Sequence, residues 1–223
     1  VVVAAVVGNA AVNKQMKVIL IDHDDSFTNI LAQYIANVTG AEPLILNHKK
    51  TSLSALKKLS PTHIILSPGP GNPKKKKDFA IGAAILKNFN LPILGVCLGH
   101  QGICAYFGAE ITQTAPRHGR KSQITHNKKG LFKNIPSSFT AMRYHSLIAE
   151  NLPEELEATA FAGSEIMAVQ HKTRPIFGVQ FHPESIGTEH GLKIIENFFK
   201  ESLRGQIPFS GGTLSSMNAK DGK

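Results

Sequence analysis

The segment GVCLGHQ, residues 95–101, follows an apolar run and contains one of only two cysteines in the 223-residue chain. A cysteine bracketed by glycines, where a strand turns sharply into a helix, is the sulfur form of a nucleophile elbow. The helix N-terminus behind such a turn favours the thiolate, which is the reactive form. The pattern therefore indicates that Cys97 is a nucleophile. The alternative is an inert core cysteine, the interpretation we give to Cys104.

A second segment, GVQFHPES at residues 178–185, contains the base that a cysteine nucleophile needs. His182 can take the thiol proton, and Glu184 can orient the imidazole. Pro183 fixes the chain between them, just beyond a predicted strand. The sequence thus predicts covalent catalysis by a triad with Cys97 as the nucleophile. The competing interpretation is a core histidine that is paired with a local carboxylate.

The stretch SPGPG, residues 67–71, is suited to holding a small anion. Glycines in series let backbone N–H groups converge on one point, as an oxyanion hole requires. Pro68 and Pro70 have no N–H, so Gly69 and Gly71 are the available donors. A rigid turn without a ligand is the alternative. Neither a GxGxxG nor a Gly-Lys-Ser/Thr motif is present, which argues against a nucleotide phosphate site.

Some of the ten histidines suggest other roles. Cys97 and His100 have a C-x-x-H spacing, but no second Cys/His pair has ligand spacing, so we expect no metal. We interpret His100 as a packing or gating residue, and His118 as a possible contact for substrate or a partner. Six others are expected at the surface: His23, His48, His63, His126, His171 and His190.

These residues must be positioned by an alternating series of strands and helices. Apolar runs predict strands at 17–21, 43–46, 63–66 and 92–96, and amphipathic periodicity predicts helices at 26–37, 52–59, 78–89, 99–107 and 190–203. Ser26 and Thr51 are expected to cap the first two helices. Ile30 in the first helix and Leu192 in the last are expected to face the core.

The alternation predicts an α/β, three-layer fold with a central, mainly parallel sheet flanked by helices. Ligands bind at the carboxyl ends of such strands. The SPGPG turn and the Cys97 turn both follow strand ends, so we expect them to share one crevice. Shorter segments, around 122–125, 140–144, 156–161, 167–171 and 176–180, predict a small antiparallel extension.

The net charge of +9 and the pI of about 9.6 would permit binding to a polyanion. Part of the excess lies in Lys74–Lys77, and no nucleic-acid motif or aromatic platform accompanies that run. A run of lysines between a turn and a helix is usually a solvated loop, so we expect no nucleic-acid partner.

The ends of the chain are expected to lie outside the fold. Residues 1–15 begin with an apolar stretch that lacks a basic leader and is shorter than the about 20 residues that span a bilayer, so we expect an extension or linker and no membrane anchor. The domain is expected at 16–204, and 205–223 is expected to be a flexible tail or linker. Two cysteines favour a reducing compartment, the cytoplasm or a plastid.

Four motifs in order carry a resemblance to a known family. SPGPG (67–71), GVCLGHQ (95–101), RYHSL (143–147) and GVQFHPES (178–185) together resemble the class I, or triad, glutamine amidotransferases, and the resemblance covers about Met16–Arg204. The SPGPG, RYHSL and FHPES spellings are most similar to the glutaminase subunits of anthranilate synthase and aminodeoxychorismate synthase. Lys74–Lys77 depart from the family, where many relatives have a short acidic or Ala-Gly segment. This departure bears on partner contacts or on the subfamily rather than on catalysis.

The resemblance implies a role for each matching residue. Cys97 would attack the side-chain amide of glutamine, His182 would act as general base and then acid, and Glu184 would orient it. The backbone N–H groups of Leu98 and Gly69 would hold the oxyanion. The implied glutamine and oxyanion site comprises Gly69, Pro70, Gly71, Leu98, Gln101, Ser146 and Leu147.

The resemblance also implies the reaction and its setting. L-Glutamine would be hydrolysed through a γ-glutamyl thioester, and ammonia would pass to a chorismate-aminating synthase subunit, in a heterodimer or heterotetramer, to make anthranilate for tryptophan. No cofactor is expected in this chain, and Mg²⁺ is expected in the partner. Alternatives are the aminodeoxychorismate (folate) branch, the glutaminase of another synthetase, a stand-alone γ-glutamyl hydrolase, and a binding module that has lost activity.

Overall fold

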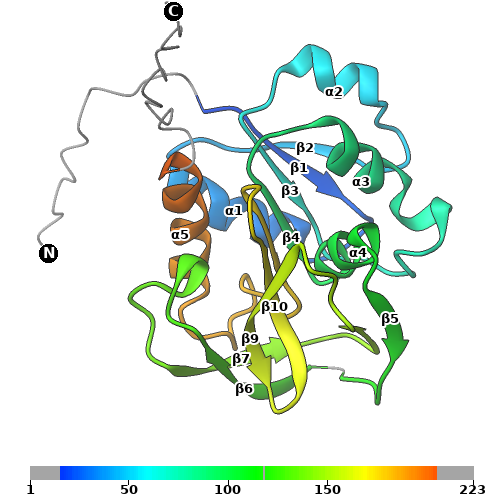
Figure 1. The fold of residues 1–223 in the computed structure, drawn as a ribbon. Coiled ribbons are helices and arrows are strands. Elements are labelled where there is room, and N and C mark those ends of the chain that lie inside the picture. The colour runs from blue at the N-terminus through cyan, green and yellow to red at the C-terminus, as the bar shows by residue number, and fades with distance from the viewer. Residues whose placement is uncertain (1–15, 118, 205–223) are drawn as a thin grey trace, which may run out of the picture.

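A computed structural model of the chain describes residues 16–117 and 119–204. Its centre is a nine-stranded mixed sheet with the order β2-β1-β3-β4-β11-β10-β9-β6-β7, and β5 pairs with β8 in a separate two-stranded sheet (Figure 1). The expected extensions at 1–15 and 205–223, and the contact proposed for His118, lie outside the described residues.

The strands are β1 (Val18–Asp22), β2 (Leu44–Asn47), β3 (His63–Leu66), β4 (Ile93–Val96), β5 (Glu110–Gln113), β6 (Arg120–His126), β7 (Ser138–Arg143), β8 (Leu147–Glu150), β9 (Leu156–Ala162), β10 (Glu165–His171) and β11 (Ile176–Val179). The helices are α1 (Thr28–Thr39), α2 (Leu53–Leu59), α3 (Lys76–Asn88), α4 (Leu98–Phe107) and α5 (Gly191–Arg204), with a short 3₁₀ helix at Gly130–Phe132. The predicted α/β fold with an antiparallel extension is confirmed.

The sheet changes character at β11. The five strands from β2 to β11 are parallel, and those from β11 to β7 pair antiparallel. β11 pairs parallel with β4, with Gly178 opposite Gly95 and Val179 opposite Val96. The two strands that precede the predicted nucleophile and base are therefore neighbours, and both end at the same edge of the sheet.

Consecutive residues of a strand point to opposite faces of the sheet. In the parallel half both faces carry buried apolar side chains, and helices cover both. Leu20 and Ile65 belong to a core cluster that includes residues of α1 and α5. Ile19 and Ile64 belong to another, with residues of α2, α3 and α4. Figure 1 shows these two helix layers on either side of the sheet.

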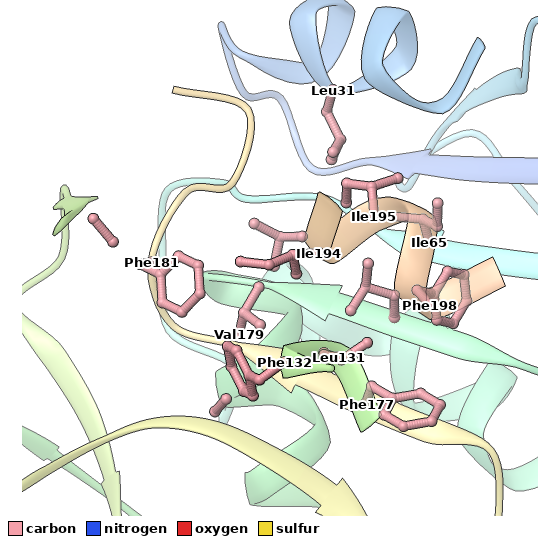
Figure 2. Packing of buried hydrophobic residues seen from close by; sticks show 14 of the residues in the cluster. Leu31, Ile65, Leu131, Phe132, Phe177, Val179, Phe181, Ile194, Ile195 and Phe198 are labelled. Carbon is pink, nitrogen blue, oxygen red and sulfur yellow. The ribbon is translucent and has the colours of Figure 1, made fainter. Parts of the chain in front are cut away.

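The C-terminal helix α5 packs in the larger of these two core clusters. Figure 2 shows Ile194, Ile195 and Phe198 of α5 packed near Phe177 and Val179 of β11. The rings of Phe177 and Phe198 meet edge to face, with centroids 6.0 Å apart. α5 therefore supports the strand that leads to His182.

Several local predictions were wrong. α1 begins after Phe27 without a side-chain cap, so Ser26 does not cap it. Thr28 instead ties the helix to β1 by donating from its hydroxyl to Asp22 Oδ1 at 2.7 Å. Ser52, rather than Thr51, caps α2 by accepting from Ala55 N at 3.2 Å.

Burial was also misjudged at some positions. Ile30 and Leu192, expected inside, are 41% and 45% exposed. His23, His63 and His171, expected at the surface, are buried. The strands β5 and β8 were not predicted.

Each of these buried histidines has a polar partner that makes its burial tolerable. His23 Nδ1 lies 3.3 Å from Ser67 Oγ, and His63 Nε2 lies 2.8 Å from Ser202 Oγ. His171 Nδ1 accepts from the backbone N–H groups of Thr173 and Arg174.

The packing of α5 predicts a difference between two positions on the same helix. Phe198 is fully buried, whereas Leu192 is 45% exposed. Phe198→Ala should lower the free energy of unfolding by about 3–5 kcal/mol, because it leaves a cavity in the core. Leu192→Ala should change it by about 0.5 kcal/mol or less. Urea unfolding of both variants measures the difference, and equal losses would contradict this packing.

The buried imidazole of His63 predicts a pH dependence of stability. Burial lowers the pKa of His63 from 6.5 to about 4. Between these values the unfolded chain binds a proton that the folded chain does not, so the free energy of unfolding falls as the pH drops from 6.5 towards 4. The loss is about 1.4 kcal/mol for each unit of difference in pKa.

Replacement of His63 should remove part of that loss. Urea unfolding at pH values on either side of the window should show a shallower decline for His63→Gln than for the parent chain. His190→Asn is the matched control, since His190 is exposed and asparagine tolerates its positive φ of 58°. If the free energy of unfolding declined equally with pH in the parent and in His63→Gln, the pKa of His63 would not be lowered in the folded state.

Candidate active site

Cys97 occupies a sharp turn between β4 and α4. Its φ of 50° and ψ of −99° are rarely adopted by a residue with a side chain. The turn is held on both sides: Cys97 N donates to Val179 O at 2.8 Å, and Gln101 N donates to Cys97 O at 3.0 Å. The strained elbow expected from the sequence is therefore present, anchored to β11 and to the first turn of α4.

The flanking glycines are required by close approach of the backbone. A Cβ on Gly99 would lie 2.3 Å from Leu66 O, and one on Gly95 would lie 2.4 Å from Gly99 C. Both distances are too short for any side chain. α4 can therefore begin directly against the end of β3 only because these two residues are glycine.

His182 follows β11 and is positioned from two directions. Its backbone N donates to Met142 O at 3.1 Å, and its backbone O accepts from Thr188 Oγ1 at 2.7 Å. Its Nδ1 lies 2.7 Å from Glu184 Oε1, both side chains being buried. This pair fixes the ring with Nε2 available for chemistry. Within the described residues, Nε2 is buried and has no hydrogen-bond partner of normal geometry.

The electrostatics favour a charged imidazole next to the thiol. Burial lowers the pKa of His182, but interactions with Cys97 and Glu184 outweigh it and hold the pKa well above 6.5. Phe27 and Tyr144 add an apolar enclosure, with ring centroids 5.7 and 4.9 Å from that of His182. Such a group can give a proton to a leaving amine and take one from water.

A small cavity of about 160 Å³ lies over Cys97. This is below the about 300–1,000 Å³ of drug-sized pockets, which fits a small metabolite. Its walls are Gly69, Pro70, Gly71, Cys97, Gln101, Tyr144, His145, Ser146 and Leu147. The structure thus brings together the predicted glutamine and oxyanion residues, except that Leu98 is buried beside the cavity.

The loop that contains Gly69 is tightly seated. A Cβ on Gly69 would lie 2.5 Å from His23 Cβ, and Gly71 has a φ of 114°. Asp78 holds the far end of the loop by accepting from Asn72 N at 2.9 Å. In the described part of the chain, the N–H groups of Gly69 and Leu98 donate to no other group. They are therefore free to bind an oxyanion.

The structure also shows the surroundings of three other residues that the sequence analysis discussed. Gln101 uses its Nε2 to donate to Leu147 O at 2.8 Å, which leaves its Oε1 for a substrate. His100 is fully buried, and a Cβ on Gly178 would lie 2.7 Å from its Nδ1, so it packs between α4 and β11 rather than acting as a gate. Burial raises the pKa of Cys104, which suits a core residue.

Gln180 was not predicted as a site residue, yet its Nε2 lies 3.7 Å from Cys97 Sγ. A signal was available, because residues two apart in an extended segment point to the same side, and Gln180 precedes His182 by two. Tyr144 and His145, which line the cavity, were quoted only as part of the RYHSL motif. In the described ranges, no group of three His, Cys, Asp or Glu side chains converges as a metal site would require.

Comparison with known proteins agrees with this geometry. The family model described as glutamine amidotransferase class-I matches residues 19–202. The chain belongs to the class-I glutamine amidotransferase family. The match covers every element from β1 to α5 apart from their outermost residues.

Curated relatives of the amidotransferase include separate subunits and longer proteins. It is 42% identical over 191 residues to an anthranilate synthase component 2 from Methanothermobacter marburgensis, covering 82% of this chain and 97% of the relative. It is 45% identical over 194 residues to an aminodeoxychorismate synthase from Streptomyces pristinaespiralis, covering 86% of this chain but 27% of the relative. The chain thus spans about a quarter of the length of that larger relative.

Solved structures show the same fold. A protein from Thermoplasma acidophilum, described provisionally as part of a GMP synthase, matches with a TM-score of 0.76 and 25% identity, covering 85% of this chain and 94% of that one. A glutamine amidotransferase from Thermotoga maritima matches with a TM-score of 0.61 at 17% identity, over 86% of both chains.

Proposed function

We propose that this amidotransferase hydrolyses L-glutamine to glutamate and ammonia, and that it delivers the ammonia to a chorismate-aminating synthase subunit. The observation that carries the hydrolytic part is the strained Cys97 turn beside the buried His182–Glu184 pair. A thiol held this way has a proton acceptor with a fixed orientation, which covalent catalysis requires.

The reaction follows from the positions of these groups. The Cys97 thiolate attacks the side-chain carbonyl carbon of glutamine, and the N–H groups of Gly69 and Leu98 stabilise the oxyanion. Protonated His182 gives its proton to the departing nitrogen, which leaves as ammonia. A γ-glutamyl thioester remains on Cys97. His182 then takes a proton from water, the water attacks the thioester, and glutamate is released with the thiolate restored.

The α-amino and α-carboxylate groups of the substrate would lie at the other end of the cavity. The free Oε1 of Gln101 suits the ammonium group, and the backbone at Ser146, Leu147 and Gly71 is close enough to line the rest. A cavity of about 160 Å³ leaves little room beyond a single amino acid. This supports a free amino acid as substrate rather than a peptide.

The partner and product are inferred from the relatives. Two archaeal relatives named anthranilate synthase component 2 are covered over 97% and 95% of their length, which supports a separate glutaminase subunit of anthranilate synthase. The aminodeoxychorismate branch is the alternative, because two Streptomyces relatives carry that name. The assembly would be a heterodimer or heterotetramer. This subunit would need no cofactor, whereas the partner would need Mg²⁺.

The setting of the reaction is part of the same proposal. Both cysteines are free, which fits a reducing compartment such as the cytoplasm or a plastid. In the part of the chain that the structure describes, no helix is long and apolar enough to cross a bilayer.

The nucleophile assignment is tested by two cysteine variants. Cys97→Ser should lower the glutaminase rate by at least about 10³-fold, because the hydroxyl is a far weaker nucleophile with this base. Cys104→Ala, a buried cysteine away from the cavity, should keep most of the activity. Binding of the partner should persist in Cys97→Ser, measured by co-purification. Undiminished glutaminase activity in Cys97→Ser would exclude the assigned nucleophile.

Product analysis separates the alternatives for the whole complex. With the co-purified partner, chorismate and glutamine, we expect anthranilate, and aminodeoxychorismate would indicate the folate branch. Glutaminase activity should be weak in the isolated chain and rise when the partner is added. High activity without any partner would instead favour a stand-alone γ-glutamyl hydrolase.

A further inference from the structure

A buried chain of hydrogen bonds leads from the substrate cavity to the nucleophile. Gln101 Nε2 donates both to Leu147 O at 2.8 Å and to Gln180 Oε1 at 3.2 Å. Gln180 Nε2 in turn lies 3.7 Å from Cys97 Sγ. Gln180 is fully buried, and Gln101, which lines the cavity, is 3% exposed.

The orientation of the Gln180 carboxamide is fixed by its neighbour. Leu147 O can only accept, so Gln101 must present its NH₂ group in that direction. The second hydrogen of the same NH₂ group then points to Gln180, whose oxygen must face it. The NH₂ group of Gln180 is therefore directed at the sulfur, where it can act only as a donor.

The backbone holds Gln180 in this position. Its N–H donates to Met167 O at 2.8 Å, which continues the pairing of β10 beyond the end of β11. The next residue but one is His182, so the donor to the sulfur and the base come from the same short segment after β11. The two side chains approach Cys97 from that segment as a fixed pair.

We propose that Gln180 is a positioning residue that donates a hydrogen bond to the Cys97 thiolate and is itself oriented by Gln101 in the glutamine cavity. A donor to an ionised sulfur stabilises the charged form more than the neutral thiol. His182 also interacts with the sulfur, and its charge acts in the same direction. The inference rests on the proposed function, because it makes Gln101 serve substrate and nucleophile together.

The chain of hydrogen bonds continues beyond Leu147 to His145 and Arg143. Leu147 O also lies 3.0 Å from His145 Nδ1, and His145 Nε2 accepts from Arg143 Nε at 3.0 Å. Arg143 is buried and paired with Glu165. The carbonyl that fixes Gln101 is therefore itself held by a buried, charge-paired network, so the orientation of Gln180 does not depend on a mobile loop.

The test measures the reactivity of Cys97 without glutamine. Carboxamidomethylation of the Cys97 peptide by iodoacetamide, followed by mass spectrometry over a range of pH, reports the fraction of thiolate. Gln180→Met removes the donor at nearly constant volume. It should shift the pH midpoint upward by about one unit, which makes the reaction about tenfold slower at pH values well below both midpoints. Gln180→Glu, which places a carboxylate at the sulfur, should shift it further.

Controls separate positioning from damage to the fold. Gln123→Glu makes the same chemical change on the exposed side of β6 and should leave the profile unchanged. Gln101→Met should shift the midpoint in the same direction, and the double variant with Gln180→Met should shift it less than the sum. If Gln180→Glu does not fold, Gln180→Met decides the question.

The outcomes are distinguishable from those of the proposed function. A parent-like alkylation profile in folded Gln180→Met would overturn the inference, whether or not the chain hydrolyses glutamine. A shifted profile in a chain that has no glutaminase activity even with the co-purified partner would support the hydrogen bond to Cys97 and contradict the proposed function. In an active chain, we expect kcat to fall about tenfold in Gln180→Met, with a smaller change in KM.

Discussion

The parallel pairing of β4 with β11 is the constraint on which the site depends. Residues far apart in the chain become neighbours because Gly178 lies opposite Gly95 and both strands end at one edge of the sheet. The bond from Cys97 N to Val179 O continues this ladder into the turn itself. A slip of the register by one residue would point the side chains beyond β11 to the other face and separate the base from the nucleophile.

Close packing makes the strained turn tolerable. A residue with the backbone angles of Cys97 persists only where its surroundings over-determine it. Here Gly95 and Gly99 permit contacts that no side chain would allow, and Gly69 packs equally closely on His23. The same contacts place free N–H groups beside the sulfur. The strain and the candidate oxyanion site thus arise from one arrangement.

Much of the fold could be predicted because it depends on local patterns. Apolar runs of four or five residues marked the parallel strands, and the glycines around Cys97 marked the turn. The burial of His63 could not be predicted this way, since its partner Ser202 lies 139 positions away. The pairing of β5 with β8 was missed because short strands of mixed burial have no clear alternation.

The same distinction holds for the candidate site: residues in local motifs could be predicted, whereas contacts between distant segments could not. Cys97, His182 and Glu184 could be proposed as a triad because each belongs to a motif with its own chemical logic, and in the structure they lie near one another. Gln180 lies in one of those motifs, but its importance comes from a contact with Cys97 that spans 83 positions. Motifs name residue types, whereas the hydrogen-bond partners of a buried carboxamide are set by tertiary structure.

The imidazole of His182 is expected to carry a proton in the resting protein because it faces the Cys97 sulfur. The direct measurement is the ¹⁵N chemical shift of that imidazole, followed by NMR as the pH rises through and beyond neutrality in the parent chain and in Cys97→Ala. We expect the parent ring to stay protonated well above pH 6.5 and the ring of Cys97→Ala to lose its proton at a lower pH. Identical titrations in the two proteins would contradict this expectation.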